Sequence, residues 1–346
     1  MDEMKTLIFR TDRIGDFIIS CPFILSYKKK FPNYKITVVT SEYNSKYINS
    51  FNFIDKIIPL KNEIKFFPKL LILIKTIFLL SAERFEDIIV LDGKNRSFFI
   101  SLFLKGKKFI FLQSKSINFI SKLFRYNCVF NYQIQNQLKN FSFLANQRNF
   151  NIDKDNINIY DNYKFNTRYT FPKKYIIIHI DEKWFQKFYY KDFTDINPSS
   201  NQIDQLIFKI LNITNNIFDI VLTSGAKNLE VIDDYASSLK LVEENIYEKK
   251  INDKIVRYVK NTSFNDLENL VRNSSFLITC EGGISHVSYN LDIETIAFYE
   301  KNRLQHMKFW TGHMKKLTLH ERKDMKSLLE DANFFNKLKN KVENLV

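Results

Sequence analysis

Two segments combine acidic, basic and glycine residues at positions where a strand would pass into a helix. The first is RTDRIGD, residues 10–16, which follows the apolar run Thr6–Phe9 and precedes a helical pattern over Phe17–Tyr27. Strand, tight turn and helix in this order build a ligand site at the carboxyl edge of a sheet, where Gly15 lets a ligand approach the backbone. Asp16 falls in the first helical turn, where an exposed carboxylate could act as a general base. First-turn acids usually cap the helix, and from this segment alone the cap is the preferred interpretation.

The second segment is TCEGGISH, residues 279–286, where a strand ends and a helix begins. Two of the seven glycines of the chain, Gly282 and Gly283, stand here. Adjacent glycines before a helix expose backbone N–H groups beside the positive end of the helix dipole, which favours a phosphate or pyrophosphate. His286 would add a donor to that anion, although a single histidine is more often solvated or part of a core. A tight turn without a ligand would also explain the glycines.

Two more strand ends carry polar residues. DEKW, residues 181–184, follows the run Tyr175–Ile180, and SGAK, residues 224–227, follows Phe218–Thr223. Doubly wound sheets place their ligand contacts at such ends. Lys183 could neutralise a leaving diphosphate, while a lone loop lysine is normally solvated.

These segments need a fold that gathers strand ends at one edge of a sheet. Short β-branched and aromatic runs alternate with amphipathic segments of helix length, a pattern typical of βα units and a parallel sheet. The pattern occurs twice, and the polar stretch Asn149–Thr170 separates the two series. It predicts two doubly wound α/β domains, residues 1–165 and 166–346, with a long terminal helix from Lys323. The expected strands are Thr6–Phe9, Lys35–Thr40, Asp55–Leu60, Asp87–Leu91 and Lys108–Leu112, then Tyr175–Ile180, Phe218–Thr223, Ile255–Val259, Phe276–Cys280 and Glu294–Phe298.

Composition indicates a globular chain in a reducing setting. The 346 residues are 45% hydrophobic and 26% charged, enough for two packed cores and a solvated surface. The three cysteines are far apart, with no metal-ligand spacing relative to the histidines, so we expect a cytoplasmic protein without a bound metal. The acids Asp153 and Asp155 lie in the polar linker and are better explained by chance than by a metal site. We expect no signal peptide and no membrane-spanning helix, since lysines and Pro68 interrupt Ile64–Leu80.

The net charge of +14 is unevenly distributed. Residues 1–165 hold 26 basic and 14 acidic residues, a net charge of +12, although an A/T-rich genome would also produce many lysines. Within them, Ile64–Leu80 predicts a helix with an apolar arc wider than one sheet face usually covers. Burial of most of these side chains is the slightly preferred interpretation. The alternative is peripheral docking on an anionic membrane, helped by a group of nearby lysines. These are Lys65, Lys69, Lys105, Lys107, Lys108, Lys115 and Lys122. The chain carries no recognised nucleic-acid module, so we predict no nucleic-acid partner.

Together the segments resemble glycosyltransferase family 9, the bacterial heptosyltransferases of lipopolysaccharide core synthesis. LIFRTDRIGDFIISCPFILSYKKKFPNYKITVV, residues 7–39, is similar to the start of that family in its RxDRIGD core, in Pro22 and in Phe31-Pro32. CEGGISHVSYNL, residues 280–291, resembles the donor loop of the family, with Glu281 and Gly282 in place of the usual Asp and Thr.

The resemblance implies a GT-B fold, two Rossmann-like domains facing a cleft, with acceptor bound mainly to the first and nucleotide sugar mainly to the second. Asp16 matches the proposed catalytic base of the family. Residues with implied contacts to the acceptor are Arg10, Asp12, Arg13 and Gly15. Residues with implied contacts to the donor are Lys183, Ser224, Gly225, Glu281, Gly282, Gly283 and His286.

The resulting prediction is an inverting, metal-independent glycosyltransferase without a cofactor. It would move a sugar, heptose favoured, from a nucleoside-diphosphate donor to a lipid-linked lipopolysaccharide or related surface glycan, at the inner face of the cytoplasmic membrane. Two alternatives stay open. One is transfer of another sugar to O-antigen or capsule, and the other is a relative that binds nucleotide sugars without catalysis.

Overall fold

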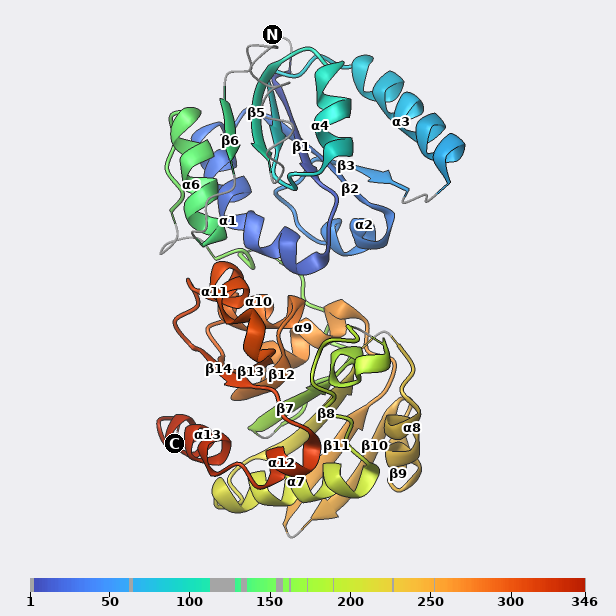
Figure 1. The fold of residues 1–346 in the computed structure, drawn as a ribbon, viewed down its shortest axis with the longest axis vertical. Coiled ribbons are helices and arrows are strands. Elements are labelled where there is room, and N and C mark those ends of the chain that lie inside the picture. Colours follow the sequence, from blue (N-terminus) through green and yellow to red (C-terminus); the bar gives the residue numbers. More distant parts are fainter. Residues whose placement is uncertain are drawn as a thin grey trace. The chain divides into compact units, whose positions relative to one another are not determined.

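The chain forms two compact units, Met1–Lys164 and Phe165–Val346, each a β-sheet with helices on both faces (Figure 1). The structure is a computed structural model. It describes residues 3–61, 65–112, 128–131, 136–153, 158–161, 163–172, 174–188, 190–225, 227–251 and 253–345.

Unit 1 is a parallel sheet with the strand order β3-β2-β1-β4-β5-β6. The strands are β1 (Lys5–Arg10), β2 (Lys35–Ser41), β3 (Lys56–Leu60), β4 (Asp87–Val90), β5 (Lys107–Leu112) and β6 (Cys128–Asn131). The helices are α1 (Ile14–Lys30), α2 (Glu42–Ile48), α3 (Phe66–Ser81), α4 (Asn95–Leu102) and α6 (Gln137–Gln147). Helices α1 and α6 pack together on one face of the sheet, and α3 and α4 lie on the other (Figure 1).

The order of the strands reverses beside β1, which pairs with β2 on one side and β4 on the other. In open α/β sheets a ligand crevice forms at the carboxyl ends of the strands where the order reverses. Leu7, Ile8 and Phe9 are fully buried, as expected for a central strand covered on both faces. The RTDRIGD turn therefore begins at the point of the sheet where a ligand is expected.

Unit 2 is a sheet with the strand order β14-β13-β12-β7-β8-β11-β10-β9. Its pairs are parallel except those of β10 with β11 and β9. The strands are β7 (Tyr175–Ile180), β8 (Asp219–Ser224), β9 (Lys240–Glu243), β10 (Ile246–Ile251), β11 (Lys254–Val259), β12 (Phe276–Cys280), β13 (Glu294–Tyr299) and β14 (Leu317–Glu321). The α-helices are α7 (Ser200–Ile213), α8 (Glu230–Ser237), α9 (Phe264–Arg272), α10 (Gly283–Asn290), α11 (Leu304–Thr311), α12 (Met325–Leu329) and α13 (Ala332–Glu343), with 3-10 turns η1 (Glu182–Trp184), η2 (Gln186–Phe188) and η3 (Lys301–Arg303).

The strand order of unit 2 reverses beside β7, which lies between β8 and β12. The loops after these three strands carry DEKW, SGAK and EGGISH, so three of the predicted segments meet at one edge. The doubly wound α/β class is confirmed in both units, with a strand at each predicted position. Strands β6, β9, β10 and β14 were not predicted.

The predicted long terminal helix is wrong. Two helices, α12 and α13, meet at Asp331, whose carboxylate accepts the N–H groups of Asn333 at 3.0 Å and Phe334 at 3.3 Å and so caps α13. Burial of the Asp331 carboxyl raises its pKa, but Lys323, the N–H of Phe334 and His320 outweigh this effect and lower the pKa to about 2. Among the helices that the structure describes, none is long and apolar enough to cross a bilayer.

Candidate active site

Arg10, the last residue of β1, organises the turn into α1. It is 1% exposed. Its guanidinium donates to the carbonyl oxygens of Asp16 and Leu91, each at 2.7 Å, and Nη1 lies 3.3 Å from Oδ2 of Asp12. These contacts offset part of the cost of burying the cation, while its Nη2 makes no hydrogen bond within the described residues. Arg10 therefore ties the first turn of α1 and one carboxylate to the end of β4.

Asp16 is the third residue of α1, as predicted, and makes the cap contact. Its Oδ2 accepts the backbone N–H of Arg13, the exposed N-cap residue, at 3.1 Å. Its Oδ1 lies 4.0 Å from Nη2 of Arg10, within ion-pair range but beyond a hydrogen bond. Gly15 is buried beside it. Capping occupies one oxygen of Asp16, and the second oxygen can still accept a proton.

Asp12 lies within the same turn and has a perturbed pKa. The pKa of Asp12 is raised to about 7, because burial of the carboxyl and the charges of Asp16 and Asp92 together outweigh the opposing charge of Arg10. The backbone oxygen of Asp12 accepts a hydrogen bond from the side-chain amide of Asn44. A carboxyl with a pKa near neutrality can both hold and release a proton at working pH.

Asp92 supports this turn and was missed by the sequence analysis. Its Oδ2 accepts from the N–H of Thr11 at 3.2 Å and from the hydroxyls of Thr11 and Ser97, each at 2.6 Å. Its Oδ1 accepts the N–H of Lys94 at 3.1 Å. Asp92 directly follows the predicted strand Asp87–Leu91, so the strand-end argument used for the other segments would have found it.

In unit 2, Lys183 lies at the N-terminus of α10. Its ammonium donates to the carbonyl of Glu281 at 2.7 Å and lies 3.4 Å from Oδ2 of Asp181. Gly282 is the N-cap residue of α10, and a Cβ at this position would overlap the ammonium of Lys183. The glycine thus provides the space for the cation. An ammonium beside the positive end of a helix dipole is an arrangement suited to an anion.

Glu281 and Arg322 border this cation. Burial raises the pKa of Glu281, and the charges of Lys183 and Arg322 partly offset that effect. Arg322 is buried just after β14 and donates to the carbonyl oxygens of Thr194, at 3.1 Å, and of Lys183. Its Nη1 also lies 3.6 Å from Sγ of Cys280. Arg322 was missed because β14 was not predicted, and it joins three segments around the Lys183 loop.

Gly225 and Ser224 line the neighbouring strand end. A Cβ at Gly225 would come within 2.9 Å of both Cβ of Asp181 and Oε2 of Glu182, so a glycine permits the loops after β7 and β8 to approach. The hydroxyl of Ser224 lies 3.1 Å from that of Tyr258. Ser224, Gly225 and Tyr258 line a cavity of about 260 Å³. The segment before α9 adds polar side chains to its lining, among them Thr262 and the N-cap residue Ser263.

Gly283 and His286 belong to α10. Gly283 is its first residue, and its N–H is among those left without an intrahelical acceptor. His286 is 8% exposed, and its ring stacks beside that of His313 with centroids 6.4 Å apart. Contact of His286 with a donor phosphate stays a prediction.

Compared by sequence, the chain matches no family model and no curated protein. Compared by structure, it is similar along its whole length to E. coli heptosyltransferase WaaC with ADP, at 15% identity and a TM-score of 0.70, covering 99% of this chain and 100% of that one. It is also similar to a glycosyl transferase of family 9 from Veillonella parvula, at 12% identity and a TM-score of 0.66, covering 100% and 98%. A putative UDP-N-acetylglucosamine 2-epimerase from Listeria monocytogenes is more distant, at 13% identity and a TM-score of 0.55, covering 99% and 91%.

The fold is therefore of the GT-B type, two Rossmann-like units in one chain, and the resemblance to family 9 is confirmed at the level of the fold. Epimerases of nucleotide sugars share this fold with the transferases. A shared fold does not determine the reaction, which depends on the residues around Asp16 in unit 1 and around Lys183 in unit 2.

Proposed function

We propose that this protein is an inverting glycosyltransferase of the family 9 type. It moves a sugar, heptose favoured, from a nucleoside-diphosphate donor to a lipid-linked lipopolysaccharide or related surface glycan. The observation that carries the proposal is the placement of the Lys183 ammonium against Gly282, at the N-terminus of α10. An ammonium and the N-terminus of a helix meet there, at the strand ends where a doubly wound sheet binds its ligand.

The donor assignment is supported by chemistry and by similar proteins. The diphosphate of a nucleotide sugar is an anion that suits this site, and the polar cavity beside Ser224 would take the nucleoside. Two of the similar structures are of E. coli heptosyltransferase WaaC, with ADP and with ADP-2-deoxy-2-fluoro heptose. We infer an adenosine diphosphate sugar as the first donor to test.

In the proposed reaction the acceptor hydroxyl attacks the anomeric carbon while Asp16 takes its proton. The bond from the anomeric carbon to the diphosphate breaks in the same step, which inverts the configuration. The charge of the leaving diphosphate is met by Lys183, by the backbone N–H groups at the start of α10 and by His286. Such preorganised donors act where charge develops. Because these groups supply the positive charge, the proposed reaction uses no metal.

Donor binding can be tested by thermal unfolding with nucleoside diphosphates and their sugars. A ligand that binds the folded chain stabilises it by mass action, by about 2.7 kcal/mol at a hundred times its Kd. Stabilisation by a nucleotide sugar that is lost in Lys183→Met supports the site. Equal stabilisation of wild type and Lys183→Met would move the donor elsewhere.

A further inference from the structure

Helix α3 turns its largest apolar side chains away from the core of unit 1. Phe67, Leu71, Ile74 and Phe78 follow one another at intervals of four, three and four residues, so they share one helix face. Phe67 and Phe78 are each 76% exposed, and Leu71 and Ile74 are exposed as well. Leu70 and Leu79 widen this surface, and we call these six residues the α3 face.

The opposite side of α3 makes the contact with the unit. Thr76 and Leu80 are buried there, and the Thr76 hydroxyl donates to the carbonyl of Ile72 at 2.7 Å. Leu73 and Ile77 are only partly buried against the core. The slightly preferred expectation that most of this arc is buried is therefore wrong, because α3 rests on the unit through a narrow side.

Helix α4 packs against α3 (Figure 1). Two exposed rings lie on α4 and at its C-cap. Phe99 and Phe103 are 40% and 56% exposed, with ring centroids 5.1 Å apart. Soluble proteins rarely expose apolar side chains in such numbers unless the surface binds a partner.

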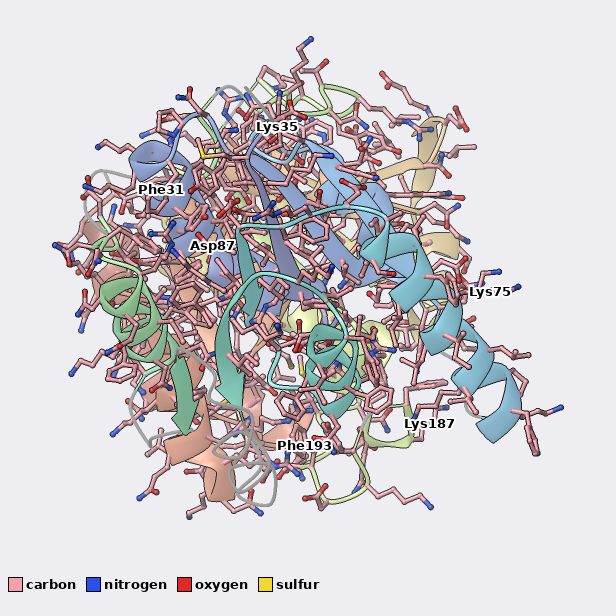
Figure 2. The ribbon with its side chains drawn as sticks, turned by 90° about the horizontal axis from the view of Figure 1, so that it is seen from above. Phe31, Lys35, Lys75, Asp87, Lys187 and Phe193 are labelled. Atoms are coloured by element: carbon pink, nitrogen blue, oxygen red, sulfur yellow. The ribbon has the colours of Figure 1, made fainter. Side chains whose placement is uncertain are left out.

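The charges around the α3 face indicate which partner. Lys75 is exposed beside the α3 face, one turn from Leu71 and Leu79, and Phe66–Ser81 contains no acidic residue. Lys65 and Lys69 are exposed as well, but they share the stripe of Thr76 on the other side of the helix. Lys75 points away from the unit (Figure 2). A second copy of this face would bring no acidic residue of α3 to meet Lys75, whereas an anionic bilayer takes phenyl rings into its interface and a flanking lysine at its headgroups.

The other lysines that the sequence suggested for membrane docking differ in exposure. Lys105 and Lys107 are exposed, while Lys108 is partly buried with its ammonium donating to the carbonyl of Leu104 at 2.9 Å. Lys115 and Lys122 lie outside the described residues.

We propose that the α3 face docks unit 1 on an anionic bilayer surface, with α3 lying in the plane of the interface. Its role, to hold unit 1 near a lipid-linked acceptor, rests on the proposed function. Each lysine close to the surface should strengthen binding about fivefold, the equivalent of about 1 kcal/mol.

Vesicle sedimentation tests this surface without nucleotide or acceptor. The purified chain should sediment with vesicles of phosphatidylcholine and phosphatidylglycerol in equal parts, and sedimentation should weaken as salt rises through the screening range. Phe67→Ser with Phe78→Ser should weaken binding at least about tenfold, because each phenyl ring loses its apolar transfer. Lys75→Glu should weaken binding at least about fivefold, because one attraction is lost and one repulsion is added.

Matched variants elsewhere in unit 1 control for the loss of an exposed aromatic ring and for the change in net charge. Tyr43 on α2 is also 76% exposed, so Tyr43→Ser should bind vesicles like the wild type. Lys30→Glu changes the net charge by the same amount as Lys75→Glu at an exposed position of α1, on the other face of the sheet, and should weaken binding far less. Thermal unfolding of each variant shows whether the fold is kept.

Three results would overturn the proposal. They are equal binding to pure phosphatidylcholine, no binding at low salt, and undiminished binding of both α3 variants. A dimer that dissociates in Phe67→Ser with Phe78→Ser, without vesicle binding, would assign the face to self-association and also overturn it. Transfer to a water-soluble acceptor fragment would leave the proposed function intact in each case, so the two failures can be told apart.

Discussion

Asp16→Asn separates the two roles that the structure allows for this residue. The amide oxygen of asparagine can still accept the N–H of Arg13, now 3.1 Å from Oδ2, so the capping hydrogen bond is kept. The variant loses the interaction of a charge with the helix dipole, worth about 0.3–1 kcal/mol, and a weak ion pair with Arg10 at 4.0 Å. We expect a loss of about 1 kcal/mol in the free energy of unfolding, which would lower Tm by about 2–4 °C.

The expected effect on turnover is larger. Removing a general base typically costs about 10²- to 10⁴-fold in rate, or about 2.7–5.5 kcal/mol in the barrier. The assay measures kcat with saturating donor and acceptor, beside Tm of the same preparation. Donor affinity, measured by titration, should stay near wild type because the proposed donor contacts lie in unit 2.

Asp324→Asn is the control for the loss of a capping carboxylate. Asp324 is the exposed N-cap residue of α12, and its Oδ1 accepts the N–H of Ser327 at 3.0 Å. This variant should lower Tm by a similar amount and leave kcat near wild type. Near-wild-type kcat in Asp16→Asn would refute the reasoning and leave Asp16 as a helix cap.

The same sites give three further predictions. Gly282→Ala should displace the Lys183 ammonium, and both this variant and Lys183→Met should weaken donor affinity by about 10- to 150-fold. This is the equivalent of one lost charge-assisted hydrogen bond. Unchanged affinity in a calorimetric titration would show that Lys183 does not contact the donor. Burial raises the pKa of Asp12 from its usual 3.8 to about 7, so the folded chain holds a proton that the unfolded chain releases, and the free energy of unfolding should fall from about pH 4 to about pH 7. Urea unfolding should show this fall to be smaller in Asp12→Asn, and parallel profiles would contradict the pKa shift. Turnover should survive EDTA, and loss on chelation with rescue by Mg²⁺ or Mn²⁺ would show that Lys183 and α10 do not suffice.

The sequence predicts the strand ends well because each follows a continuous apolar run. All residues of Tyr175–Ile180 are buried, so the sequence shows both the apolar strand and the first polar residue after it. The Gly282-Gly283 pair was also recognisable, since glycine is rare in this chain. Apolar runs and glycine pairs do not show which residues a side chain contacts, such as the contact of the Lys183 ammonium with Gly282.

Other features depend on contacts between distant residues. Arg322 could not be found because it follows β14, Leu317–Glu321, a short and only partly buried strand at the edge of the sheet. The break between α12 and α13 comes from the capping carboxylate of Asp331, which an apolar pattern does not show. Periodicity identified α3, but a helix that is apolar almost all round gives no sign of which side meets the sheet. The inward side includes the polar Thr76.

The central claim is tested most directly by transfer itself. The purified chain is incubated with nucleotide sugars, beginning with ADP-heptose and followed by UDP-sugars, with and without a lipopolysaccharide inner-core acceptor. Product mass and released nucleoside diphosphate are then measured together. The account predicts that the acceptor gains one sugar for each diphosphate released, that release depends on acceptor, and that both are lost in Asp16→Asn. Binding of nucleotide sugars without transfer to any acceptor, or conversion of the donor without an acceptor, would contradict it.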